Sequence, residues 1–135
     1  MVGGMLWRLN TRKTEMAHQG PGYSVKSVEP VALGADVQAR VFTLAPGEEI
    51  PWHFHSAVTD WYFVLEGALS IETRAPRDRQ LLRVGERYSI PPKTAHLIGN
   101  HSDTDTRFLL LQGIGAYDFI PVGADPLIQS GGRRA

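Results

Sequence analysis

Short runs of alternating apolar and polar residues, separated by glycine and proline, extend along most of the chain. The alternation is clear at residues 23–28 and 68–73, while residues 37–44 and 61–65 are rich in β-branched and aromatic side chains. Because successive side chains on a strand point to opposite faces, a period of two predicts half-buried strands. Gly67 lies between two of these runs and predicts a hairpin turn.

The second half of the chain continues this pattern in further short runs, at residues 80–84, 87–90, 95–100, 108–112 and 117–120. Turn-forming residues separate nearly all of them, and no long stretch has the 3.6-residue period of an amphipathic helix. About eight to ten strands at this spacing are typical of a sandwich or barrel, so we predict an all-β fold. Residues 5–18 are compatible with a short helix or an arm.

The length of 135 residues suits a single domain with its own core. The 14 Lys and Arg balance the 14 Asp and Glu, and this absence of net charge argues against bulk attraction to nucleic acid. The absence of cysteine excludes disulfides, thiolate metal sites and thiol nucleophiles. No apolar run approaches the ~20 residues of a membrane span, and the first residues do not match a secretory signal. We therefore predict a soluble, cytoplasmic protein without membrane or nucleic-acid partners.

The residues with the clearest chemical potential are two histidines one residue apart, His53 and His55. On a strand these two rings face the same side and can converge on one ion. A third ligand must come from a neighbouring strand, and His96 is the candidate; Asp60 is the candidate oxygen ligand. These side chains suit one divalent metal ion, with Fe, Mn, Zn, Ni and Cu all left open. The other two histidines have no partner pattern, so we expect His18 in an arm and His101 in a loop.

The spacing of these residues resembles the two sequence motifs of the cupin superfamily. Gly47-x5-His53-x-His55-x4-Asp60-x6-Gly67 is similar to the first motif, G-x5-H-x-H-x3,4-E-x6-G. Gly85-x5-Pro91-x-Lys93-x2-His96-x3-Asn100 is similar to the second, G-x5-P-x-G-x2-H-x3-N. The short connection between them, residues 68–84, is similar to that of compact single-domain bacterial cupins.

This resemblance implies a double-stranded β-helix, the jelly-roll barrel of cupins, with a metal inside near one mouth. It implies that His53, His55 and His96 bind the metal and that Asp60 is the fourth ligand. The expected organisation is a short N-terminal arm at residues 1–22, the barrel at residues 23–122 and a C-terminal tail at residues 123–135. The motif glycines would occupy turns with positive φ.

The sequence departs from the cupin motifs at two positions. Asp60 replaces a glutamate and is one methylene shorter, so it reaches a metal only if the backbone moves inward, or acts through a water. Three-histidine coordination is the alternative. Lys93 replaces a glycine and tolerates positive φ poorly, which predicts a different turn. Asn100 is expected to cap a loop through hydrogen bonds rather than to bind metal.

Strand parity predicts what surrounds the metal. If Asp60 faces inward, Tyr62 and Val64 do so too, and Ile98 follows His96. Arg40 and Gln112 are further candidates for the wall of this largely apolar pocket, and Tyr62 is the candidate to orient a substrate or pass a proton.

The opposite face of the same strand carries Trp61, Phe63 and Leu65. Such an apolar row needs cover, either from another part of the chain or from a second copy in a homodimer, which we favour.

Fold does not fix function, so three interpretations are weighed. The favoured one is a metal-dependent enzyme acting on a small molecule, either dioxygenase-like or a Lewis-acid isomerase or decarboxylase. The alternative is a non-catalytic cupin that binds or senses a small molecule. The third, a sugar-nucleotide epimerase-like barrel without metal, is disfavoured by the complete metal motif.

Overall fold

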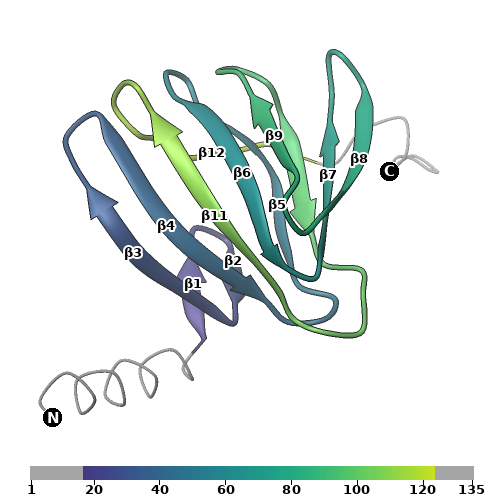
Figure 1. Cartoon of the computed structure of the whole chain (residues 1–135). Helices are drawn as coiled ribbons and strands as arrows, with labels where there is room; N and C mark the ends of the chain where they lie inside the picture. The colour runs from purple at the N-terminus through teal and green to yellow at the C-terminus, as the bar shows by residue number, and fades with distance from the viewer. Residues whose placement is uncertain (1–16, 124–135) are drawn as a thin grey trace, which may run out of the picture.

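Two five-stranded antiparallel sheets form most of the computed structural model, which describes residues 17–123 (Figure 1). One sheet has the strand order β3-β4-β11-β6-β9 and the other the order β12-β5-β10-β7-β8, while β1 and β2 form a separate hairpin. The prediction of an all-β double-stranded β-helix is confirmed. The strands are β1 (His18–Gly20), β2 (Tyr23–Val25), β3 (Ser27–Leu33), β4 (Val37–Leu44), β5 (Glu49–Phe54), β6 (Thr59–Glu66), β7 (Ala68–Thr73), β8 (Asp78–Arg83), β9 (Arg87–Ile90), β10 (His96–Gly99), β11 (Thr106–Gly113) and β12 (Ile120–Pro121).

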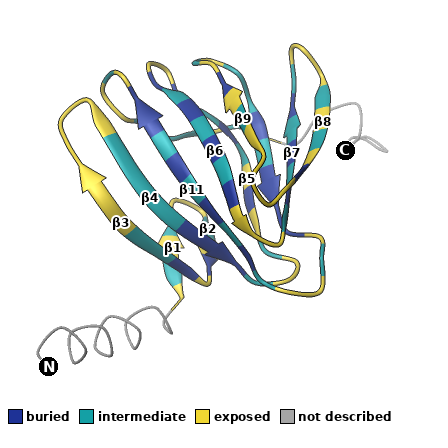
Figure 2. Ribbon diagram, in the orientation of Figure 1, coloured by how far each residue is buried: buried dark blue, intermediate teal, exposed yellow. Residues whose placement is uncertain are grey.

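The hydrophobic core lies between the two sheets. The rings of Phe42 and Phe108 stack there with centroids 5.3 Å apart and an interplanar angle of 6°. Along β6 and β11 the buried positions alternate with half-buried ones (Figure 2). Asp60, Tyr62 and Val64 are the buried set on β6, which agrees with the parity predicted from the sequence.

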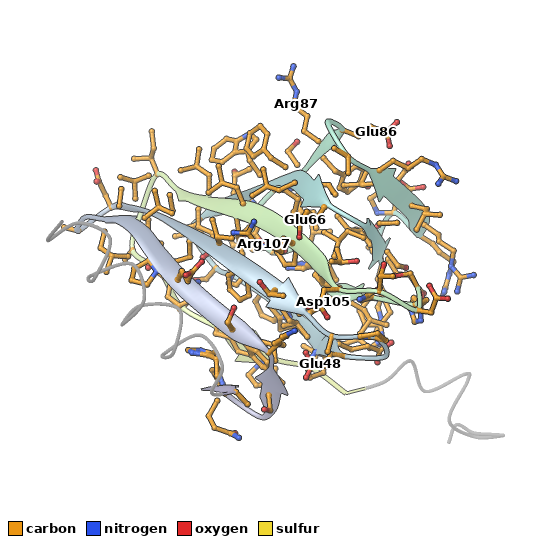
Figure 3. The ribbon with its side chains drawn as sticks, turned by 60° about the horizontal axis from the view of Figure 1, so that its bottom comes forward. Glu48, Glu66, Glu86, Arg87, Asp105 and Arg107 are labelled. Atoms are coloured by element: carbon orange, nitrogen blue, oxygen red, sulfur yellow. The ribbon has the colours of Figure 1, made fainter. Side chains whose placement is uncertain are left out.

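The outer face of β6 is apolar, as the same parity predicted. Trp61 and Phe63 are half-buried there and, with Arg87 of β9, line a groove, while Leu65 is 42% exposed. Charged side chains lie at the end of β6. There Glu66 is the register partner of Arg107 on β11, and the two lie close together in Figure 3. The homodimer across this face remains a prediction.

Glycines with positive φ connect the strands where the motif spacing predicted turns. Gly47, Gly67 and Gly85 have φ values of 83°, 77° and 87°, a region that side chains with a Cβ avoid. The expectation that Lys93 would change its turn was wrong, because Lys93 itself adopts φ 65°. Its backbone N–H donates to the His55 carbonyl at 2.7 Å, and this contact holds the turn in place.

Asn100 closes a loop, as predicted. Its side-chain amide donates to the carbonyls of Leu44 (2.9 Å) and Thr104 (2.8 Å), and its Oδ1 accepts from the backbone N–H of Ser102. Every polar atom of this buried side chain is therefore used in holding backbone segments together.

The sequence interpretation was less accurate near the ends of the barrel. His18, expected in an arm, begins strand β1 and pairs with Val25 of β2. The run at 23–28 is divided between two strands, and β3 continues through Pro30, where a register shift follows. Proline is tolerated there because β3 is an edge strand.

Residues 1–16 of the predicted arm, and the tail from residue 124 onward, lie outside the described residues. Within residues 17–123, no helix is long and apolar enough to cross a membrane.

A pair of glycine variants separates two reasons for keeping glycine in these turns. At Gly85 an alanine would have to adopt positive φ, but its Cβ would have no heavy atom within 4 Å. We therefore expect Gly85→Ala to lower the free energy of unfolding by about 1–2 kcal/mol. An alanine Cβ at Gly67 would also lie 2.6 Å from Thr106 Oγ1 and 2.7 Å from the Asp105 carbonyl oxygen. Gly67→Ala should therefore lower the free energy of unfolding clearly more, as measured by urea denaturation. Equal losses would contradict this steric explanation.

Candidate metal centre

Four buried side chains meet between the two sheets. His53 of β5 and His96 of β10 are register partners on one sheet, and His55 follows β5 directly. Asp60 comes from β6 of the other sheet. Each of the four offers a ligand atom, and these atoms all lie within 4.8 Å of one another. The structure thus brings together the residues that the motif spacing indicated.

Main-chain carbonyl oxygens fix the orientation of all three imidazole rings. A carbonyl oxygen only accepts hydrogen bonds, so each Nδ1 carries a proton, and in a neutral ring it is the only nitrogen that does. The Nε2 lone pair is then left for the interior of the cluster, an arrangement typical of metal-binding histidines. The Nδ1 contacts are His53 with Pro51 (2.7 Å), His55 with Asp118 (2.6 Å) and His96 with Thr94 (2.8 Å).

The Asp60 carboxylate reaches this cluster although its side chain is shorter than the glutamate of the motif. Its Oδ2 lies 3.3 Å from His55 Nε2 and 3.2 Å from His96 Nε2. The Tyr62 hydroxyl donates to Oδ2 at 2.8 Å, and Gln112 Nε2 donates to Oδ1 at 2.9 Å. Two donors therefore hold the carboxylate in place; whether it binds metal directly or through a water remains a prediction.

The electrostatics of the cluster favour an ionised Asp60. Burial alone would raise the pKa of Asp60, but the rings of His55 and His96 outweigh burial and hold this pKa well below its usual range. Burial alone would lower the pKa of His55, and Asp60 raises it instead. Burial, with the charge of His96, lowers the pKa of His53 to about 3. His53 is therefore neutral and able to bind metal over a wide pH range.

The donor set fits a divalent cation. Three imidazole rings and a carboxylate face one another. The buried Nε2 of His96 makes no well-formed hydrogen bond, although the Asp60 Oδ2 lies 3.2 Å from it. A buried polar atom without a partner costs about 1–3 kcal/mol, so an ion that all four groups can bind would relieve this cost. Three nitrogens and one oxygen suit Fe, Mn, Zn, Ni or Cu.

A cavity of about 10 Å³ adjoins the cluster, and aromatic side chains form much of its wall. The ring of Phe119 stacks on that of His53 with the ring centroids 4.2 Å apart, and the ring centroids of Tyr117 and His55 are 5.5 Å apart. Both belong to the segment between β11 and β12. The sequence analysis missed the part this segment takes in the site, since no motif includes it. Its only signal was the pair of aromatic residues beside Asp118.

The predicted pocket residues divide into two groups. Arg40, Gln112 and Tyr62 line the cavity, whereas Val64 and Ile98 belong to the hydrophobic core and are not part of this lining. Burial, together with the charge of Asp60, raises the pKa of Tyr62 well above its usual value. The Tyr62 hydroxyl is thus a stable donor to Asp60, and its transfer of a proton to a substrate remains a prediction.

The family of the protein follows from the two motifs and this centre. A family model described as Cupin domain matches residues 40–112, a region that includes all four side chains of the cluster. The match spans more than half of the chain, and the chain belongs to the cupin family. No curated protein matches the sequence significantly.

Solved structures share the fold at low sequence identity. An uncharacterized conserved protein from Klebsiella pneumoniae with a double-stranded β-helix domain is 22% identical, with a TM-score of 0.62 over 71% of this chain and 81% of that one. A cupin superfamily protein from Desulfitobacterium hafniense is 21% identical, with a TM-score of 0.57 over 64% and 75%. Lactobacillus farciminis oxalate decarboxylase is 17% identical, with a TM-score of 0.65 over 79% of this chain and 33% of that one. At these identities the similarity establishes the fold alone.

Removal of the Tyr62 hydroxyl tests whether its hydrogen bond to Asp60 helps this carboxylate to bind metal. Partners that orient a metal ligand typically contribute about 10–100-fold to metal affinity, so we expect Tyr62→Phe to weaken metal binding by about tenfold. Tyr88→Phe is the matched control, because the Tyr88 hydroxyl donates to Asp78 at 2.8 Å, away from the cluster. Competition with a chromophoric chelator measures both affinities. Equal affinities of the two variants would show that Asp60 needs no help from Tyr62.

Proposed function

We propose that this cupin binds one divalent metal ion through His53, His55, His96 and Asp60 and is a metal-dependent enzyme for a small molecule. Dioxygenase-like chemistry is the first choice, and Lewis-acid isomerisation or decarboxylation the second. The observation that carries the proposal is the convergence of three imidazole rings and one carboxylate in a buried site. When bound, the metal would supply a Lewis acid or, if redox-active, a centre for oxygen chemistry.

The residues around the centre support such a role by controlling its surroundings. Tyr62 and Gln112 keep the charged oxygens of Asp60 directed at the cluster. The rings of Phe119 and Tyr117 cover the histidines and exclude bulk water, which strengthens electrostatic interactions at a reaction centre. Among the similar structures are an oxalate decarboxylase and an oxalate oxidase in complex with the substrate analogue glycolate, so this fold does serve enzymes.

A non-catalytic binding or sensing cupin is the second candidate. The observation in its favour is the small size of the cavity beside the cluster, about 10 Å³, which is about the room for one water. A wall this tight suits a protein that closes on a small ligand and holds it, whereas an enzyme must also admit a substrate and release a product.

Metal content tests the first part of the proposal. We expect the purified protein to hold about one divalent ion per chain by elemental analysis, because the cluster forms one site. His96→Ala and His53→Ala should each lose most of it, since each removes a nitrogen from a buried set. His101→Ala is the matched control, because the His101 side chain is 57% exposed and outside the cluster. Full metal stoichiometry in both cluster variants would refute the ligand assignment.

Turnover distinguishes the enzyme from the binding protein. We expect iron-loaded protein to consume oxygen with at least one member of a panel of small phenolics and diketones, and His96→Ala protein to consume none above background. Zinc- and manganese-loaded protein, followed by NMR with small keto and hydroxy compounds, covers the Lewis-acid alternatives. If no metal supports turnover of any substrate class, the binding or sensing role is favoured instead.

A further inference from the structure

The wall of the cavity contains a cation that has no counter-ion among residues 17–123. Arg40 of β4 lies between two aromatic rings, with its guanidinium carbon 5.1 Å from the Phe42 centroid and 5.4 Å from that of Tyr117. One terminal nitrogen donates to Gln112 Oε1 at 2.7 Å. The Nε is buried and makes no hydrogen bond, and within residues 17–123 the guanidinium forms no salt bridge.

This environment is incomplete for an arginine. Arg40 as a whole is half-buried, but its Nε–H is buried, and a buried donor without a partner is costly unless a hydrogen bond compensates. One terminal nitrogen of Arg40 is used by Gln112, and the guanidinium also bonds the Tyr117 hydroxyl. The Nε–H stays unpaired, and an arginine Nε–H with a neighbouring terminal N–H can bind both oxygens of a carboxylate. Arg40 is therefore ready for a carboxylate that the described part of the chain does not supply.

The position of Arg40 connects this fork with the metal centre. Gln112 Oε1 accepts hydrogen bonds from Arg40 and from Gln38 Nε2 (2.9 Å), so the Gln112 amide must point its NH2 group at Asp60. The same small cavity is lined by Arg40, His53 and His55. A ligand in the cavity would have the histidine cluster on one side and the guanidinium on the other.

The charges of the site also favour an anion. With a divalent ion bound, the ion, the Asp60 carboxylate and the Arg40 guanidinium together would carry a net charge of about +2. Tyr23 and Tyr117 in the lining add hydroxyl groups but no negative charge at neutral pH, because burial raises the pKa of both.

We infer that the ligand of this cavity is a small carboxylate, whose carboxylate group pairs with Arg40 while its other end reaches the metal. This inference rests on the proposed function, since it takes the metal to be bound. A ligand of more than one or two heavy atoms does not fit into about 10 Å³, so part of the wall must move. The ring of Tyr117, which is 40% exposed and borders Arg40, is the part that would swing outward.

Binding to cobalt-loaded protein tests the inference without any need for turnover. Pyruvate and lactate are titrated against their uncharged counterparts, pyruvamide and lactamide, with calorimetry and the cobalt absorption spectrum as readouts. We expect Arg40→Gln to weaken carboxylate binding by about tenfold or more, since hydrogen bonds between charged groups are lost, and to change amide binding little. Arg83→Gln, an exposed position on edge strand β8, is the matched control and should bind as the wild type does.

The outcomes separate this inference from the proposed function. Equal carboxylate affinity in wild-type and Arg40→Gln protein, both fully loaded with cobalt, overturns the inference and leaves the metal site intact. Failure of the wild type to bind cobalt overturns the proposed function. If Arg40→Gln does not fold, Arg40→Lys keeps the charge but loses the fork and should still bind carboxylates more weakly. A crystal structure of the cobalt-loaded wild type with pyruvate also decides: a carboxylate bound away from Arg40 is incompatible with the inference.

Discussion

The candidate centre depends on three hydrogen bonds between imidazole Nδ1 atoms and main-chain carbonyls. Each bond selects one tautomer and aims one lone pair at the same small volume, where Asp60 adds a negative charge. Two of the carbonyls, those of Pro51 and Thr94, lie two residues before the histidine they orient, so the backbone that carries each ring also aims it. The third, from Asp118, makes the segment between β11 and β12 part of the centre. The buried Nε2 of His96 has no hydrogen-bond partner among the described residues, and a bound cation would satisfy it.

The parts of the fold that local geometry determines could be predicted from the sequence. The alternation of side chains on a strand was enough to place His53 with His55 and to divide β6 into an inner and an outer face. Positive φ at Gly67 and Gly85 was expected from the resemblance to the cupin motifs, and the conformation is local to each turn. At these positions the conformation of a few consecutive residues decides the outcome.

Features that depend on contacts between distant segments could not be predicted. Pro30 made strand β3 hard to recognise from the sequence, because proline lacks the N–H that an interior strand needs. Only the sheet order shows that β3 is an edge strand, where this N–H is not required. The stacking of Phe119 on His53 and the unpaired Nε of Arg40 arise from the meeting of segments far apart in the chain. Lys93 adopts the conformation of the glycine it replaces because its N–H is held by the His55 carbonyl, a contact that no local propensity reveals.

The origin of the four ligand candidates in two different sheets has a mechanical consequence. His53 and His96 belong to one layer and Asp60 to the other, so a shared ion would act as a cross-link between the layers. Occupancy would then contribute directly to the work needed to separate the sheets, by the linkage that holds for any ligand of the native state. Chelation would then make the chain more susceptible to proteases, and the amount of this protein that persists would follow the supply of metal.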